Sequence, residues 1–153
     1  MEEKFMKEAL KEAKKAYDKL EVPVGCVIVK DGKIISRAHN LKETKFDTTK
    51  HAEILAIQKA SKKLKSWRLI NCQMYVTLEP CLMCAGSILQ SRIKKLVYAT
   101  CEQKFGVIES KMQIFNNQSI FNHSVEVVSG IFKLEASELL KEYFKQKRKS
   151  YSI

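Results

Sequence analysis

The sequence contains no long apolar run, and no stretch approaches the roughly 20 residues that a membrane-spanning helix needs. It also lacks internal repeats, linkers and low-complexity tracts, and only 2 prolines and 5 glycines occur in 153 residues. The lack of a long apolar run excludes a membrane-spanning helix. A chain of 153 residues without linkers or repeats is long enough for one domain and too short for two, so we expect a single domain over residues 1–153. The start, Met1-Glu2-Glu3-Lys4, is acidic and then amphipathic, which is not typical of a secretory signal.

Acidic residues are also few relative to basic ones. The chain has 17 Asp and Glu against 28 Lys and Arg, a formal net charge of +11. Such an excess indicates a polyanionic partner, although a lysine-rich composition can also serve solubility alone. The partner is slightly favoured because the C-terminal stretch is denser in cations than the average of the chain, at Lys141, Lys145, Lys147, Arg148 and Lys149.

Two short motifs carry the chemistry. His51-Ala52-Glu53 is followed about thirty residues later by Pro80-Cys81-Leu82-Met83-Cys84. Together they offer one imidazole, two thiols and a carboxylate, which fits three zinc ligands, one zinc per chain, and a general acid/base. A structural zinc site usually has four protein ligands, whereas a catalytic site has three and an open position. We therefore predict zinc on His51, Cys81 and Cys84, with Glu53 as proton shuttle.

The spacing of these motifs is typical of helix N-termini. Cys81 and Cys84 are three residues apart, so their side chains share a face on a first helical turn. Pro80 fits a helix start, where its missing N–H has no cost. The partial positive charge of two helix N-termini favours thiolates at the metal.

The other three cysteines, Cys26, Cys72 and Cys101, lie outside the motifs. Cys26 and Cys72 have apolar, strand-like surroundings and are predicted to be buried free thiols. Free cysteines are typical of a reducing compartment, so we expect the protein in the cytoplasm.

Apolar periodicity and turn residues predict the secondary structure. The predicted helices cover 2–20, 51–64, 82–91 and 133–149. The predicted strands cover 24–29, 33–39, 74–77, 95–100 and 125–128. Residues 101–124 have no clean period and are predicted as a long loop with a short helical turn, and a loop of that length is often functional. Asp31-Gly32 predicts a tight hairpin, so the α/β fold has one mixed sheet of five strands with helices on both faces.

Longer blocks of sequence resemble bacterial tRNA-specific adenosine deaminases, members of the cytidine-deaminase-like zinc enzymes. The resemblance runs from the first helix to the last, and its motifs are more specific than the zinc ligands alone. The blocks are Glu21-Val22-Pro23-Val24-Gly25, His51-Ala52-Glu53, Val76–Gly86 and Ser91-Arg92-Ile93.

This resemblance implies a three-layer α/β/α fold, a homodimer, and conversion of the wobble adenosine of a tRNA anticodon to inosine by zinc-activated hydroxide. It places Asn40 against the target nucleoside and Val22 and Pro23 in the lining of the pocket. We also assign Ala52, between the ligand His51 and Glu53, to substrate binding. RNA contacts are expected at Lys145, Lys147 and Arg148.

Three positions depart from the family pattern. The family usually has Pro where Thr48 stands, Ala where Lys50 stands, and Asp where Glu102 stands. None of these positions takes part in the zinc chemistry. We expect them to alter the contacts with RNA rather than the reaction.

Two other functions fit part of the same pattern. A deaminase of free guanine, cytosine or a nucleotide would have the same zinc ligands, but the basic C-terminal helix and the Glu21–Gly25 block argue against it. A zinc-stabilised RNA-binding module without catalysis is the second alternative. Glu53 argues against that module, because a structural site needs no carboxylate beside an open coordination position.

Overall fold

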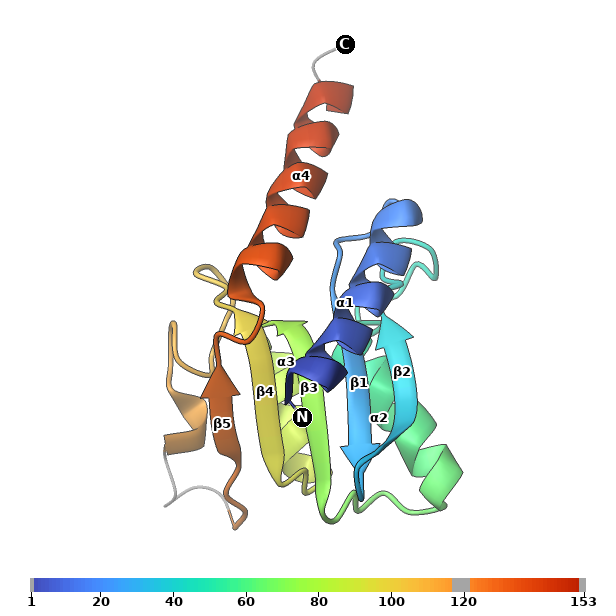
Figure 1. The fold of residues 1–153 in the computed structure, drawn as a ribbon, viewed down its shortest axis with the longest axis vertical. Helices are drawn as coiled ribbons and strands as arrows, with labels where there is room; N and C mark the ends of the chain where they lie inside the picture. The colour runs from blue at the N-terminus through green and yellow to red at the C-terminus, as the bar shows by residue number, and fades with distance from the viewer. Residues whose placement is uncertain (1, 117–121, 152–153) are drawn as a thin grey trace.

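The computed structural model describes residues 2–116 and 122–151 (Figure 1). Within them the helices are α1 (Glu2–Asp18), α2 (Ala52–Leu64), α3 (Leu82–Gln90), α4 (Lys133–Tyr151) and a 3-10 turn, η1 (Ile114–Asn116). The strands are β1 (Gly25–Lys30), β2 (Lys33–His39), β3 (Cys72–Leu78), β4 (Lys95–Thr100) and β5 (Glu126–Ser129). The predicted elements are thus confirmed to within about two residues at each end. Part of the predicted loop, residues 117–121, lies outside the described residues.

The five strands form one mixed sheet in the order β2-β1-β3-β4-β5. β1 pairs antiparallel with both β2 and β3, whereas β3, β4 and β5 run parallel. The hairpin between β1 and β2 turns at Asp31 and Gly32, whose φ angles of 50° and 74° are both left-handed. Two left-handed residues are the requirement of a type I′ turn, as the Asp-Gly pair predicts.

Helices cover both faces of the sheet. α1 and α4 lie on one face and α2 and α3 on the other (Figure 1). Along β1 the side chains alternate, so Cys26 and Ile28 face the core under α2 and α3. Val27 and Val29 face α1. This period of two produces two apolar cores, one on each side of the sheet.

Local backbone conformation sets two helix boundaries that differ from the predictions. α1 ends at Asp18 because Leu20 adopts a left-handed φ of 63° and the Glu21 N–H bonds back to the Ala16 carbonyl. Pro23 therefore follows the helix end rather than causing it. α2 begins at Ala52, and His51 is its extended N-cap residue.

The arrangement brings one end of several elements together. β3 and β4 are parallel, so their carboxyl ends share an edge of the sheet, and β3 leads there into α3. α2 also begins at this end, and the outer part of α4 projects beyond it (Figure 1). Among the described helices, none has both the length and the apolar character needed to cross a membrane.

Candidate active site

The metal-ligating side chains come from two helix N-termini. His51 is the N-cap of α2 and Cys81 is the N-cap of α3, both with extended backbone. Neither side chain makes a capping hydrogen bond, and each residue's carbonyl accepts the first bond of its helix, from Leu55 and Ala85. The imidazole and the thiol are therefore left free to point at a common position beyond the helix ends.

The donor atoms are spaced as a tetrahedral metal requires. The Nδ1 atom of His51 lies 3.7 Å from the Cys81 sulfur and 3.5 Å from the Cys84 sulfur. Ligands bound at about 2.3 Å (sulfur) and about 2.05 Å (nitrogen) to a tetrahedral zinc are separated by about 3.6 Å. All three donor atoms lie within 4.8 Å of one another, and no other such group occurs in residues 2–116 and 122–151. The structure thus brings the three predicted ligands together.

Glu53 lies directly behind this donor set. Only 4% of the residue is exposed, and its carboxyl is within hydrogen-bonding reach of Cys84. Burial raises the pKa of this carboxyl from its ordinary 4.5 to about 7. The side chain is therefore placed to exchange a proton beside the metal position.

The two thiols have different ionisation. A hydrogen bond from Cys84, with a second contribution from His51, lowers the pKa of Cys81 to about 4. The same hydrogen bond, together with burial, raises the pKa of Cys84. Contact with Cys81 in turn raises the pKa of His51. The lowered pKa of Cys81 favours its thiolate, the form in which a cysteine binds a metal.

The predicted pocket residues are buried or half-buried around the end of β2 and the start of α2. Asn40 is 7% exposed, and its amide donates to the Val22 carbonyl at 3.3 Å and accepts the Lys42 N–H at 3.1 Å. These bonds fix the side chain at the end of β2. Pro23 is buried, Val22 packs against the core, and Ala52 is fully buried.

Two buried carboxylates that the sequence interpretation missed hold the loops around the site. Glu21 accepts the backbone N–H groups of Glu43 and Thr44 at 3.0 and 2.6 Å. Glu79 holds the loop after β4, where its carboxylate accepts the backbone N–H of Glu102 at 3.0 Å. Glu21 is 0% and Glu79 2% exposed. The available signal for such a role was an acidic residue beside an apolar strand. The backbone groups that it bonds lie more than 20 residues away in the chain, so the local sequence does not identify them.

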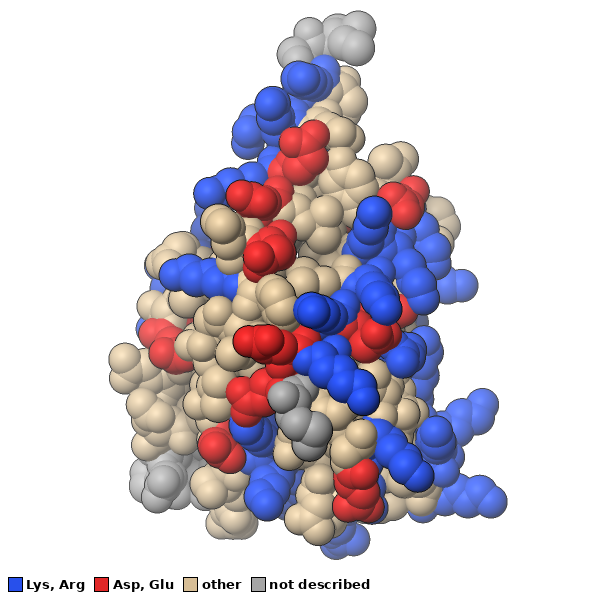
Figure 2. Space-filling model, viewed as in Figure 1, with Lys and Arg blue, Asp and Glu red and all other residues tan. Residues whose placement is uncertain are grey.

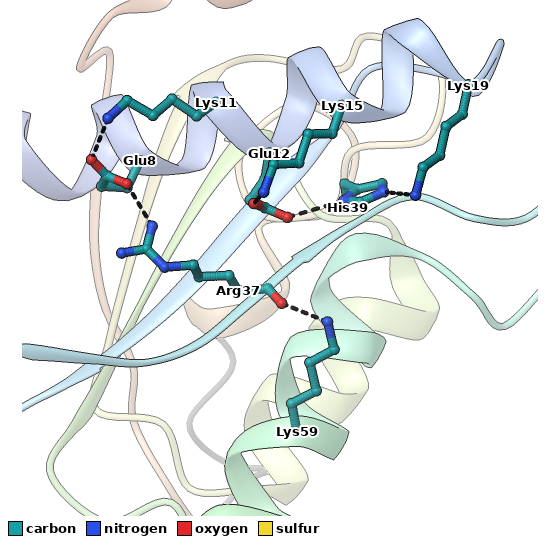
Figure 3. A network of polar contacts seen from close by, with 8 residues as sticks. All are labelled: Glu8, Lys11, Glu12, Lys15, Lys19, Arg37, His39 and Lys59. Atoms are coloured by element: carbon teal, nitrogen blue, oxygen red, sulfur yellow. Dashed lines mark hydrogen bonds and ion pairs between the residues drawn. The ribbon is translucent and has the colours of Figure 1, made fainter.

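A network of polar contacts joins α1, β2 and α2 (Figure 3). Glu12 contacts Nδ1 of His39 at 3.0 Å, and the Lys19 ammonium lies 2.9 Å from Nε2. Because an ammonium can only donate, Nε2 accepts and Nδ1 donates to Glu12. His39 is the last residue of β2, so its hydrogen bond to Glu12 ties the end of this strand to α1.

The predicted RNA-contacting residues lie apart from the metal ligands, on α4. Figure 2 shows basic side chains along the left edge and tip of α4 and acidic ones along its front. Lys145 and Arg148 are exposed, and the Lys147 ammonium lies 5.7 Å from the centre of the Tyr143 ring. Arg148 also lines a cavity of about 300 Å³ with Lys141, Phe144 and the carboxyl end of β4.

The donor geometry and the fold agree with the comparisons to known proteins. A family model of MafB19-like deaminases matches residues 1–148. The tRNA-specific adenosine deaminase of Bacillus subtilis (strain 168) is 47% identical over 148 residues, covering 97% of this chain and 91% of the relative. The chain belongs to the tRNA-specific adenosine deaminase family. The resemblance found in the sequence motifs is thus confirmed over nearly the full length.

Solved structures similar to this protein show which fold it shares. A structure from studies of A-to-I editing by tRNA:A34 deaminases has a TM-score of 0.85 and 40% identity, covering 89% of this chain and 98% of that one. This match confirms the predicted cytidine-deaminase-like α/β fold with its five-stranded mixed sheet. Guanine deaminase from Bacillus subtilis is 42% identical with a TM-score of 0.63, over 65% of this chain and 64% of that one.

Proposed function

We propose that this protein hydrolytically deaminates the wobble adenosine of a tRNA anticodon to inosine. The observation that carries the proposal is the 47% identity, over almost the whole of both chains, to a tRNA-specific adenosine deaminase. The convergence of His51, Cys81 and Cys84 beside a buried Glu53 supports it independently. We assign the reaction to one deaminase domain formed by residues 1–153.

We propose that zinc, one ion per chain, is the metal. The set of one imidazole and two thiols, with donor spacings near 3.6 Å, suits zinc, which prefers nitrogen and sulfur in tetrahedral geometry. When bound, zinc supplies a Lewis acid that lowers the pKa of a water ligand toward neutrality. His51, Cys81 and Cys84 would hold it, and these three protein ligands would leave room for the water.

The protein's own residues then carry the protons and the substrate. Glu53 removes a proton from the attacking water and delivers it to ring N1 of the adenine, which makes C6 electrophilic. Once the water oxygen has bonded to C6, Glu53 takes the second proton from that oxygen and gives it to the amino group. The C6–N bond then breaks, ammonia leaves, and the C6 carbonyl of inosine remains. Asn40, with Val22 and Pro23 beside it, is the proposed polar contact to the nucleoside, and Ala52 forms the floor behind the ligands.

RNA is the proposed partner because the bases of an anticodon loop are already unpaired, which lowers the cost of placing one in the pocket. The net charge of +11 favours a phosphate-rich ligand. We assign backbone contacts to Lys145, Lys147 and Arg148 on α4. The substitutions at Thr48, Lys50 and Glu102 are proposed to change affinity for the loop without changing the reaction.

We further propose a homodimer located in the cytoplasm. Leu82, at the start of α3, is 55% exposed and Met83 is half-buried, so the apolar side of α3 is not covered within one chain. All five cysteines are free thiols, which suits a reducing compartment. Sedimentation equilibrium at micromolar concentration should give twice the 17.6 kDa of one chain, and a monomer mass would reject the dimer.

One assay tests the proposed reaction. The zinc-loaded protein is incubated with a tRNA that carries a wobble adenosine, and separately with free adenosine, guanine and cytosine. Mass spectrometry should detect inosine in the tRNA only. Deamination of guanine or cytosine without inosine in RNA would favour a free-base deaminase, and RNA binding without any product would favour an inert zinc module.

A further inference from the structure

The loop from 41 to 50 connects two residues of the site. It begins after Asn40 at the end of β2 and ends before His51, the N-cap of α2. Phe46 lies in this loop with 96% of its surface exposed, more than any other large apolar residue among those described. Its φ is 53°, in the left-handed region.

The exposure of Phe46 does not come from a loose loop. The Leu41 N–H bonds to the Lys50 carbonyl at 3.0 Å and closes the loop at its base. Inside it, the Lys45 N–H bonds to Leu41 and the Asp47 N–H to Lys42, at 2.9 and 3.1 Å. The chain therefore presents the ring from a preorganised backbone.

The loop is also anchored to the rest of the fold. The buried Glu21 carboxylate accepts the N–H groups of Glu43 and Thr44, the two residues that follow Lys42. The Lys42 N–H itself bonds to the Asn40 side chain at 3.1 Å. The position of Phe46 is thus fixed relative to the residue that we assign to the target nucleoside.

This geometry is unfavourable for the isolated protein. A phenyl ring in water forgoes the stabilisation that its burial would contribute, and a left-handed φ is sterically unfavourable at a bulky residue. Strained residues that persist on a rigid backbone tend to occur at binding sites. A ligand with a flat apolar face would recover the lost contact.

The neighbouring charges indicate which ligand. Lys42 and Lys45 are exposed, and both shortly precede Phe46 in the same loop. Of the loop's two acidic residues, Asp47 is already occupied, because it accepts the Thr49 N–H and hydroxyl and its carboxylate lies 3.9 Å from the Lys50 ammonium. Proteins that bind single-stranded nucleic acids combine exposed aromatic rings, on which bases stack, with nearby cations that contact the phosphates.

We propose that Phe46 stacks on an RNA base outside the catalytic pocket, while Lys42 and Lys45 contact the adjoining phosphates. This inference rests on the proposed function and adds a second subsite to it, in the loop between Asn40 and the predicted ligand His51. It makes the 41–50 loop part of substrate recognition, independent of the basic residues of α4.

The test compares Phe46→Ala, Phe46→Trp and the control Leu20→Ala in the zinc-loaded protein. Leu20 is a suitable control because it is 79% exposed with a left-handed φ of 63°, but it belongs to the turn after α1. Affinity for an anticodon stem-loop is measured by fluorescence anisotropy, and KM and kcat by inosine formation. Loss of one base–aromatic stack corresponds to about 5- to 150-fold weaker binding.

We expect Phe46→Ala to show that loss in affinity and KM with little change in kcat, and Phe46→Trp and Leu20→Ala to stay within about twofold of the parent. The salt dependence of Phe46→Ala should be unchanged. In Lys42→Gln/Lys45→Gln the slope of log K against log salt should fall by about 1.4, since two single-strand phosphate contacts are lost.

The results that would contradict the stacking subsite differ from those that would contradict the proposed function. If the parent protein forms no inosine in tRNA, the proposed function is wrong. If the parent forms inosine but Phe46→Ala matches it in affinity and KM, the stacking subsite is wrong. A change in sedimentation mass of Phe46→Ala with unaltered RNA affinity would also overturn it, and would assign the ring to a contact between subunits.

Discussion

The backbone N–H of Glu109 donates a hydrogen bond of 2.8 Å to the carboxylate of Glu79, although 30 residues separate them in the chain. The same carboxylate accepts the N–H groups of Glu102 and Ser110 at 3.0 and 2.9 Å and the Ser110 hydroxyl at 2.5 Å. Glu79 stands two residues before Cys81. The buried Glu79 side chain therefore couples the loop after β4 to the segment between β3 and α3, which contains the predicted ligand Cys81.

Glu79→Gln should loosen this loop. A glutamine offers a single acceptor oxygen, and its amide N–H groups would face the N–H donors of Glu109 or Ser110, which leaves buried donors unpaired. We expect the free energy of unfolding to fall by about 1–3 kcal/mol and amide exchange at 102, 109 and 110 to accelerate. Urea denaturation and hydrogen exchange measure the two effects.

Glu138→Gln, on the exposed side of α4, is the matched control and should stay within about 0.5 kcal/mol of the parent. Gly106→Ala gives a second route to the same loop. A Cβ there would lie 2.5 Å from the Glu79 carboxyl carbon and 2.5 Å from the Glu102 carbonyl oxygen. Unchanged exchange rates in both Glu79→Gln and Gly106→Ala would show that the carboxylate does not hold the loop.

Cys81→Ala should lose the metal, whereas Cys101→Ala should keep it. Cys81 is one of three converging donors, while Cys101 is an exposed thiol outside the set. Metal analysis should give about one zinc per chain for the parent and Cys101→Ala and almost none for Cys81→Ala. X-ray absorption should show one nitrogen and two sulfur ligands from the protein. Four sulfurs in the parent would refute the ligand set.

Glu53→Ala should separate catalysis from metal binding. The carboxylate is proposed to carry protons and is not a ligand, so zinc content and thermal stability should be retained. Removal of a positioned acid/base group lowers turnover by about 10²- to 10⁴-fold. Inosine formation under single-turnover conditions measures the effect, and a near-normal rate with full zinc content would rule out the proton-shuttle role.

Binding of RNA should weaken steeply as salt rises, because phosphate contacts release counterions. Replacement of Lys145, Lys147 and Arg148 by Gln should reduce the slope of log K against log salt by about 2–3. The control Lys62→Gln/Lys63→Gln/Lys65→Gln removes the same charge at the end of α2 far from His51 in the helix. Equal slopes in the two triple variants would mean that the reduced slope reflects net charge and not contacts on α4.

Acid should destabilise the fold in part through Glu21. Burial raises the pKa of this carboxyl, but the hydrogen bonds from Thr44 and Glu43 outweigh it and hold the pKa below the ordinary 4.5. A pKa that is lowered in the folded state adds stability above about pH 4.5, and this stability is lost as the pH falls through the folded value. Denaturation from pH 6 to pH 3 should show a smaller decline for Glu21→Gln than for the parent, and equal declines would count against this role.

The sequence by itself determined the order of helices and strands and predicted the three donor side chains that the structure brings together. Apolar periods of two and of three to four residues predict local structure, and His51, Cys81 and Cys84 belong to motifs in which a few neighbouring residues carry the signal. The Asp31-Gly32 turn was predictable for the same reason, since a type I′ hairpin is a requirement on two adjacent residues.

Only the tertiary structure decided how the surrounding loops are held. Glu21 and Glu79 bond to backbone groups more than 20 residues away, and nothing in the local sequence distinguishes them from surface acids. The same holds for the loop that carries Phe46, because the buried Glu21 anchors it through Glu43 and Thr44, more than 20 residues along the chain. Partners distant in the chain become neighbours only once the sheet has formed, so their pairing is a property of the fold and not of any sequence window.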